Sequence, residues 1–336
     1  LWWHRAAHLH VLPGQHMSHA LPIPRRRQHG RTLLELMIAI AIGLVILLAL
    51  GTVYVGTTRT NRQAGSVSRM SEDAAIAFSI MGGSLRMAGY STPRALVLPG
   101  GALIGGVKRV APDRNFTGAA VRGCDHGFVN AAATFDTLAC QTADTTQPAA
   151  VAVRFEGDAF NTVPITVGGV VNPSDCLNQA VLAANATPSA VDPALTFRLI
   201  ESRFTAKVGG SGTPELYCGG NGGNTTPPTF TPQPLMQFVD SVQLRYGVAS
   251  DGTSRDVTHY ASSDEVDALA GTLEDKWSRV VNLRVCVVMR SQGADQAGAG
   301  NYIDCDGNSV ASPDSHARRS FTAFYALRNR SGFLKP

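Results

Sequence analysis

The chain has 336 residues, of which 44% are hydrophobic and 16% are charged, and its formal net charge is +4 at pH 7. This length is sufficient for one large domain or two small ones with a buried core. Much of the positive charge lies in Arg25, Arg26, Arg27 and Arg31, just before a long apolar run. The charge therefore does not indicate a nucleic-acid-binding surface, and no nucleic-acid partner is expected.

Residues 1–30 precede the apolar run and are interpreted as a leader. Leu1 is not a usual initiator, and residues 1–16 have neither a helical nor a strand period. Met17 is a better start, so residues 1–16 are interpreted as a mis-assigned gene start. Residues 17–30 then form a processing segment, which is excluded from fold prediction.

An apolar run follows the leader and is long enough to cross a membrane. Residues 36–51 contain no polar side chain, and neighbouring apolar residues extend the run to about 20 residues, the length of a transmembrane helix. The arginines before it predict that this end stays in the cytoplasm and that the remainder is exported. Glu35 lies almost at the start of the run, where an ionisable side chain costs roughly 2–3 kcal/mol and is a functional candidate.

The helical pattern continues beyond the membrane-length run. No proline occurs between the run and Pro93, and the apolar residues that follow are spaced by three or four, as on one face of a helix. These residues are Val67, Met70, Ala74, Phe78, Met81, Leu85 and Ala88. The pattern predicts one helix over residues 32–88, with a membrane part at 31–56 and an amphipathic part at 57–90. Gly89 is the expected C-terminal stop.

Residues 91–336 have the texture of a β-rich globular domain. Short β-branched and aromatic runs alternate with clusters of Gly, Pro, Asn, Ser and Thr. Strands are predicted at 150–155, 194–204, 235–248, 279–290 and 319–329. Loops are predicted at 209–215, 219–234 and 291–301. The expected fold class is α+β, with the amphipathic part of the long helix covering a mainly antiparallel sheet.

All six cysteines lie after the apolar run, in the part predicted to be exported. They are Cys124, Cys140, Cys176, Cys218, Cys286 and Cys305. An even number in an exported region favours disulfides. Sequence neighbours suggest the pairs 124–140, 176–218 and 286–305, although six cysteines allow about fifteen pairings. A metal site is not expected, because no CxxC or HxxxH spacing occurs.

Several segments together resemble a known family. Gly30, followed five residues later by Glu35 and then by an unbroken apolar helix, is similar to the class III signal of type IV prepilins. The segments SLRMAGY (84–90), VDSVQLRYGV (239–248), WSRVVNLRVCVVMRS (277–291) and RRSFTAFYALRNR (318–330) resemble landmarks of the PilW family of minor pilins. Residues from about 100 to 230 carry no such resemblance.

The resemblance implies a minor pilin of a type IV pilus, similar to the GspJ-type minor pseudopilins, with a type IV pilin-like fold. A prepilin peptidase would cut between Gly30 and Arg31, and the new amino terminus of Arg31 would be methylated. Glu35 would then meet the terminal amine of a neighbouring subunit in an apolar lattice, where an unpaired carboxylate is penalised. Arg31 departs from the family, which usually has phenylalanine at this position.

The implied location is the inner membrane, with one span and a periplasmic C-terminal domain, and later the cell-surface pilus. Such proteins help to prime assembly and lie at or near the pilus tip. The implied partners are other minor pilins, the major pilin, the prepilin peptidase, the inner-membrane assembly platform and a tip adhesin.

Three other interpretations remain open on the sequence. One is a minor pseudopilin of a type II secretion system, which shares the fold and the processing. Another is a secreted binding domain cut near residues 51–56, but no A-x-A site stands there. The third is a membrane-anchored enzyme, but GxSxG, HExxH, P-loop and GxGxxG motifs are absent from the sequence. No catalytic residue and no cofactor are therefore predicted, and DCDGN (304–308) and DGTSRD (251–256) are interpreted as turns.

Overall fold

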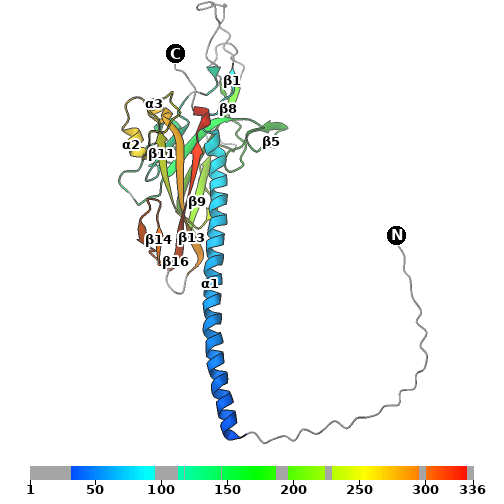
Figure 1. Cartoon of the computed structure of the whole chain (residues 1–336). Coiled ribbons are helices and arrows are strands. Elements are labelled where there is room, and N and C mark those ends of the chain that lie inside the picture. The colour runs from blue at the N-terminus through cyan, green and yellow to red at the C-terminus, as the bar shows by residue number, and fades with distance from the viewer. Residues whose placement is uncertain are drawn as a thin grey trace, which may run out of the picture. The chain divides into compact units, whose positions relative to one another are not determined.

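The computed structural model describes residues 32–94, 113–116, 118–144, 146–186, 196–223, 229–294 and 300–330. The chain divides into two compact units, residues 1–60 and 61–336. Helix α1 (Leu33–Met87) has 55 residues and contributes to both units (Figure 1). The prediction of one helix over residues 32–88 is therefore confirmed.

Helix α1 ends where a glycine adopts a left-handed conformation. Gly89 has a φ of 73°, which the absence of a side chain permits at the end of a helix. Its N–H donates to the carbonyl of Arg154 at 3.0 Å, and the N–H of Tyr90 donates to the carbonyl of Met87 at 2.8 Å. The predicted stop at Gly89 is confirmed, and the bond to Arg154 ties the helix exit to strand β4.

Strand β4 belongs to the larger of the two main sheets, which has six strands. The sheet order is β10–β9–β8–β4–β3, with β7 paired to β8, and every pairing is antiparallel. The strands are β3 (Val121–Cys124), β4 (Ala150–Gly157), β7 (Asn185–Ala186), β8 (Thr196–Val208), β9 (Pro214–Gly220) and β10 (Gln233–Gln237).

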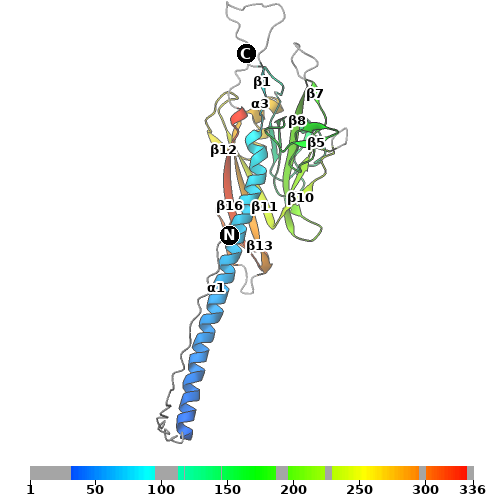
Figure 2. The same ribbon diagram turned by 90° about the vertical axis from the view of Figure 1, so that its right-hand side faces the viewer.

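The second main sheet has four strands and is also antiparallel, in the order β12–β11–β13–β16. Its strands are β11 (Val239–Val248), β12 (His259–Ala261), β13 (Val280–Ala294) and β16 (His316–Ala326). Figure 2 shows β16 alongside the cyan part of α1, and the Tyr325 hydroxyl of β16 donates to the Phe78 carbonyl of α1 at 2.7 Å.

The remaining elements are short. Three small hairpins or pairs are formed by β1 (Pro93–Arg94) with β2 (Asp113–Arg114), β5 (Ile165–Val167) with β6 (Val170–Asn172), and β14 (Asn301–Ile303) with β15 (Ser309–Ala311). The short helices are η1 (Phe135–Thr137), α2 (Ser263–Asp267), α3 (Leu273–Ser278) and η2 (Arg328–Arg330). Both α2 and α3 begin with a capping box, at Ser262 and Thr272.

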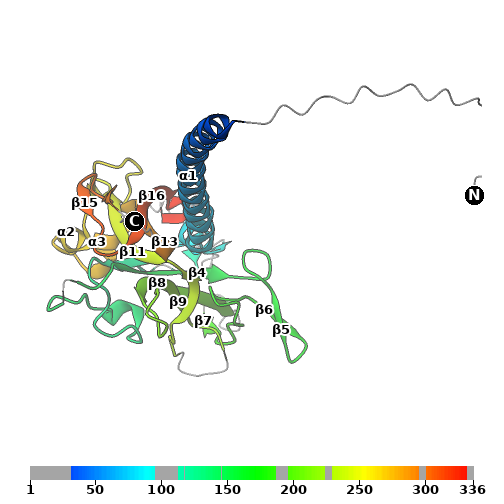
Figure 3. The ribbon, with the colours of Figure 1, turned by 90° about the horizontal axis from the view of Figure 1, so that it is seen from below.

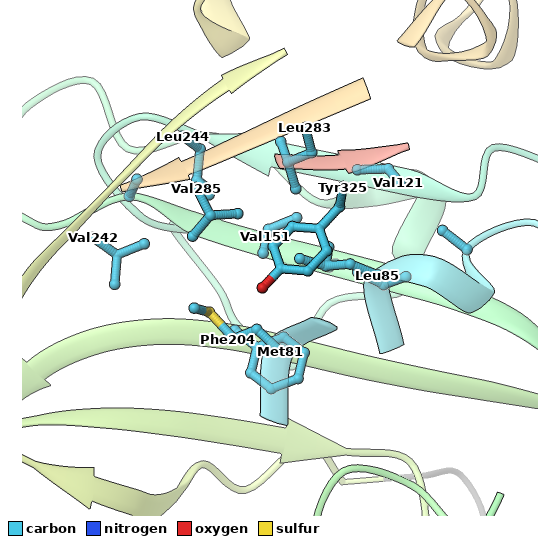
Figure 4. Packing of buried hydrophobic residues seen from close by; sticks show 14 of the residues in the cluster. Met81, Leu85, Val121, Val151, Phe204, Val242, Leu244, Leu283, Val285 and Tyr325 are labelled. Carbon is cyan, nitrogen blue, oxygen red and sulfur yellow. The ribbon is translucent and has the colours of Figure 1, made fainter. Parts of the chain in front are cut away.

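The core of the second unit is shared by α1 and the two main sheets. Met81 and Leu85 of α1 pack with residues of the six-stranded sheet, such as Phe204, and of the four-stranded sheet, such as Leu244 and Val285 (Figure 4). The buried face of α1 consists of Met70, Ala74, Ala77, Met81, Gly82 and Leu85. This face matches the predicted spacing of three and four, so the amphipathic part of the helix covers a mainly antiparallel β domain as expected.

Three predicted boundaries differ from the structure. The run 235–248 is two strands in different sheets, because Phe238 has a φ of 66° and breaks the extended chain between β10 and β11. The predicted loop at 291–301 is shorter, since β13 extends to Ala294 in register with β16. The ends of the predicted loop at 219–234 belong to β9 and β10, and residues 224–228 lie outside the described residues.

Candidate functional site: the amino-terminal helix and the disulfide-bonded domain

The first turn of α1 is organised by Thr32, which precedes the helix. The N–H of Glu35 donates to the Thr32 carbonyl at 3.0 Å and approaches the Thr32 hydroxyl oxygen at 3.3 Å. A threonine before a helix with a glutamate three residues later is the pattern of a capping box. The sequence analysis overlooked this role of Thr32, although the letters TLLE contain the signal.

Glu35 itself is exposed in the first turn of α1. A carboxylate at a helix amino terminus interacts favourably with the helix dipole. Its side chain has no ion-pair partner among the described residues of this single chain. Gly30 and Arg31 lie outside the described residues, so their relation to Glu35 rests on the sequence spacing.

The first part of α1 is apolar on all sides and uncovered. It contains the one helix window, among the described residues, that is long and apolar enough to cross a membrane, with a mean hydropathy of 2.9 and no share of the window buried. Length and composition alone are weak evidence, because a signal sequence also satisfies them. A side-chain surface of this kind requires a covering of lipid or of other apolar helices.

Three disulfides fasten loops to the sheets of the second unit. They join Cys124 to Cys140, Cys176 to Cys218 and Cys286 to Cys305, with Cα–Cα distances of 5.1, 6.5 and 5.8 Å. The first closes the loop that carries η1, the second ties the segment after β6 to β9, and the third ties the β14–β15 turn to β13. Each bond joins cysteines that are neighbours in the sequence.

The short helices α2 and α3 are fastened by a cluster around Asp267. Its carboxylate accepts from the Arg122 guanidinium and, at 2.8 Å, from the Trp277 indole N–H. Trp277 also meets Tyr246 edge to face, with ring centroids 4.9 Å apart. Burial raises the pKa of Tyr246 well above its ordinary value, so its hydroxyl stays protonated. The cluster is a packed support and exposes no reactive group.

A second ion-pair cluster lies where β13 and β16 end. The guanidinium of Arg318, which is buried, contacts Asp240 at 2.8 Å and Asp314 at 2.6 Å. These hydrogen bonds hold the pKa of Asp314 well below its usual range. The arrangement fixes the loop 312–316 against the four-stranded sheet.

The two acidic loops are turns, as predicted. Asp304 accepts from the N–H groups of Asp306 at 2.9 Å and Asn308 at 2.8 Å, in the hairpin turn between β14 and β15. Asp251 accepts from the N–H groups of Thr253 and Ser254, and these bonds lower its pKa to about 2. Across the described ranges, no three His, Cys, Asp or Glu side chains are placed to hold a metal ion.

Two family models match the chain. One describes the prokaryotic N-terminal methylation motif and covers residues 25–51. The other describes the type IV pilus-assembly protein W and covers residues 203–329, from β8 to η2. The chain belongs to the PilW family of type IV minor pilins. Members of this family are structural components and not enzymes. The long apolar helix and the antiparallel β domain give this PilW-family chain a type IV pilin-like fold.

No curated protein matches the chain. Among solved structures, the chain is similar to a type IV-like pilin from Thermus thermophilus, at 11% sequence identity and a TM-score of 0.36. The match covers 79% of this chain and 100% of that one. A TM-score of this size is too low to assign any property to the PilW-family chain. Neither family model reaches residues 52–202, which include β3 to β7 and the first two disulfide-bonded loops.

Proposed function

We propose that this protein is a minor pilin that takes part in priming the assembly of a type IV pilus and is located at or near the pilus tip. The observation that carries the proposal is the methylation motif at residues 25–51, joined to an uncovered apolar helix that begins with a capped Glu35. The PilW match at 203–329 supports the pilus rather than another exported assembly.

In this proposal the leader is removed between Gly30 and Arg31, and the amino group of Arg31 is methylated. The cut would leave Glu35 one helical turn from the new amine, since residues four apart share a helix face. A single subunit would hold this carboxylate beside its own amine, whereas a staggered neighbour would bring a second amine to it. Pairing in an apolar surrounding penalises every register that leaves Glu35 alone.

The proposed location follows the same logic. Before assembly, α1 holds the subunit in the inner membrane with the C-terminal domain in the periplasm, which suits three disulfides. After assembly, the apolar part of α1 would be covered by the corresponding helices of other subunits. The proposed partners are other minor pilins, the major pilin, the prepilin peptidase, the assembly platform and a tip adhesin.

The experiment is the intact mass and amino-terminal sequence of the membrane-extracted protein, from strains with and without a prepilin peptidase. A peptidase-dependent start at Arg31 supports the proposal, and a mass increase of one methyl group marks the modification. A start near residues 51–56, or an uncut chain in both strains, overturns it.

A second candidate is a minor pseudopilin of a type II secretion system, because both family models describe features that the two machines share. Deleting the gene distinguishes them. Loss of surface pili with normal enzyme secretion supports the pilus, and the reverse supports the secretion system.

A further inference from the structure

A short hairpin in the second unit exposes an unusual amount of apolar surface. The segment 158–174, here called the β5–β6 finger, contains β5, β6 and the turn residues before them. Figure 3 shows it projecting from the rest of the second unit, next to neither of the main sheets along its length. Its exposed apolar side chains are Phe160, Val163, Val167, Val170 and Val171. Between Asp158 and Asp175 the sequence has no charged residue.

The finger is a built structure rather than an extended loop. Gly168 and Gly169 have φ values of 58° and 79°, which two-residue hairpin turns of type I′ require. At the base, the N–H of Phe160 donates to the Asp158 carboxylate at 2.7 Å, and the Ser174 hydroxyl donates to the Val163 carbonyl at 2.6 Å. These contacts hold the apolar side chains in place before any partner arrives, which lowers the entropy lost on binding.

Both faces of the finger are apolar. Val170 and Val171 are consecutive in a strand, so their side chains point to opposite faces. They are nevertheless 56% and 51% exposed, and Phe160 is 98% exposed. A flat partner would cover one face and leave the other in water. The geometry therefore points to a groove that encloses the finger.

The charges near the finger disfavour a membrane as the occupant. Peripheral segments that insert into anionic lipid carry Lys or Arg beside their apolar residues. The finger has no Lys or Arg, and the charged residue at its start is Asp158. An apolar protein groove with a basic edge is the complementary surface.

The finger also lies between the two family models, which cover residues 25–51 and 203–329. The properties shared by the family are therefore carried by other parts of the chain. We propose that the β5–β6 finger is a docking element that inserts into an apolar groove of another pilin-class subunit and so selects this protein's neighbour in the assembly. This inference rests on the proposed pilus function.

The test uses the full-length protein in its own cells, with a photo-crosslinking phenylalanine derivative in place of Phe160. The matched control carries the same derivative in place of Val129, which is 60% exposed and lies in the loop 125–139, outside the finger. The expected result is an adduct from position 160, absent from position 129, with a chain that carries a prepilin signal. Adding Val170→Thr and Val171→Thr keeps the β-branched shape and should lower the adduct about tenfold, as for contacts at the centre of an interface.

Other results overturn the proposal. These are no adduct, an adduct with lipid only, an adduct with a second copy of this chain only, an adduct with a chain that lacks a prepilin signal, or equal adducts from both positions. An adduct that the two valine substitutions leave unchanged also overturns it. Cleavage at Arg31 and the amount of the protein in sheared pili are measured in the same strains. Loss of cleavage in every strain refutes the pilus function, whereas normal cleavage without the adduct refutes the finger alone.

Discussion

At the scale of single residues, the start of α1 combines two roles in four positions. Thr32 satisfies the backbone N–H of Glu35 and so starts the helix at a defined residue. Glu35 then presents a carboxylate at the edge of an apolar surface that nothing in the described chain covers. A charge in this place is tolerated in water or at a membrane interface and is penalised inside an apolar assembly, unless a cation meets it.

The first prediction concerns Glu35→Gln, which keeps the shape and removes the charge. Cleavage should continue, because the substitution leaves Gly30 and Arg31 in place. The amount of the protein in sheared pili should fall at least tenfold, since the charge pair with a neighbouring amine is lost. Mass spectrometry of the amino terminus and immunoblots of sheared pili measure the two effects. Normal incorporation of this variant would show that Glu35 has no assembly role.

The second prediction concerns the acid stability set by Asp314 and Arg318. The pKa of Asp314 is lower in the folded protein than in the unfolded chain, where it is about 3.9. The pair therefore contributes stability above about pH 4, and this contribution fades as the pH falls toward the folded-state pKa. Asp314→Asn should lower the free energy of unfolding by about 1 kcal/mol at pH 7, a small value because the Asp314 side chain is partly exposed.

Denaturant titrations of wild type and the Asp314→Asn variant at several pH values between 7 and 2 test this. The two stability curves should converge as the pH falls below about 4. Curves that stay parallel over the whole range would mean that the substitution acts through packing and not through the ion pair.

At the scale of elements, the last strand of the four-stranded sheet fixes the second part of α1. Tyr325 of β16 is buried, donates to the Phe78 carbonyl and lies under the Arg86 guanidinium, 5.5 Å from the ring centroid. Its ring occupies the space that Gly82 leaves open. A Cβ atom at residue 82 would lie 2.6 Å from the ring, whereas one at Gly83 would meet nothing within 4 Å. Adjacent glycines in one helix therefore have opposite roles.

The third prediction uses this pair. Gly83→Ala should raise the free energy of unfolding by about 0.5–1 kcal/mol, because alanine is the better helix former and the site is open. Gly82→Ala should lower it by about 1–2 kcal/mol, because the clash with Tyr325 exceeds the gain in helix propensity. Denaturant midpoints of the two variants are compared with wild type. Equal stabilisation by both would show that Tyr325 does not pack tightly against the helix.

The elements also show what the sequence can predict. Hydrophobic periodicity located the helix within one residue at each end, because its buried face repeats every three or four residues along 55 positions. Strands β4, β8, β13 and β16 were found for the same reason, with alternation or continuous apolar runs in place of the helical period.

The sequence could not show how these strands divide into sheets. The break at Phe238 depends on a positive φ that phenylalanine rarely adopts, so no residue type marks it. The β5–β6 finger was overlooked because its strands have three residues each, too few for a period to be visible. The role of Thr32 in the candidate site was readable from the TLLE pattern, whereas the docking of Gly82 on Tyr325 joins residues far apart in the chain.

At the scale of the whole molecule, the chain separates its tasks by region. The segments that the family models match hold the apolar helix start and the four-stranded sheet with its supporting strands. The region between them holds two of the disulfide-bonded loops and the finger. All six cysteines lie in the second compact unit, residues 61–336, so the stability of that unit depends on the compartment in which it folds.

The last prediction concerns that dependence. The disulfides span 16, 42 and 19 residues, and closing loops of this size stabilises a protein by about 3–4 kcal/mol each. Together they contribute about 10 kcal/mol, which is comparable with the whole stability of an ordinary domain. A fragment of residues 61–336 exported to the periplasm should be soluble and contain three disulfides by mass. The same fragment made in a reducing cytoplasm should be insoluble or degraded. Among variants that lack one bond, the loss of Cys176–Cys218 should lower the melting temperature most, because it closes the longest loop. A reduced fragment that melts with the oxidised one would show that the core alone stabilises the fold.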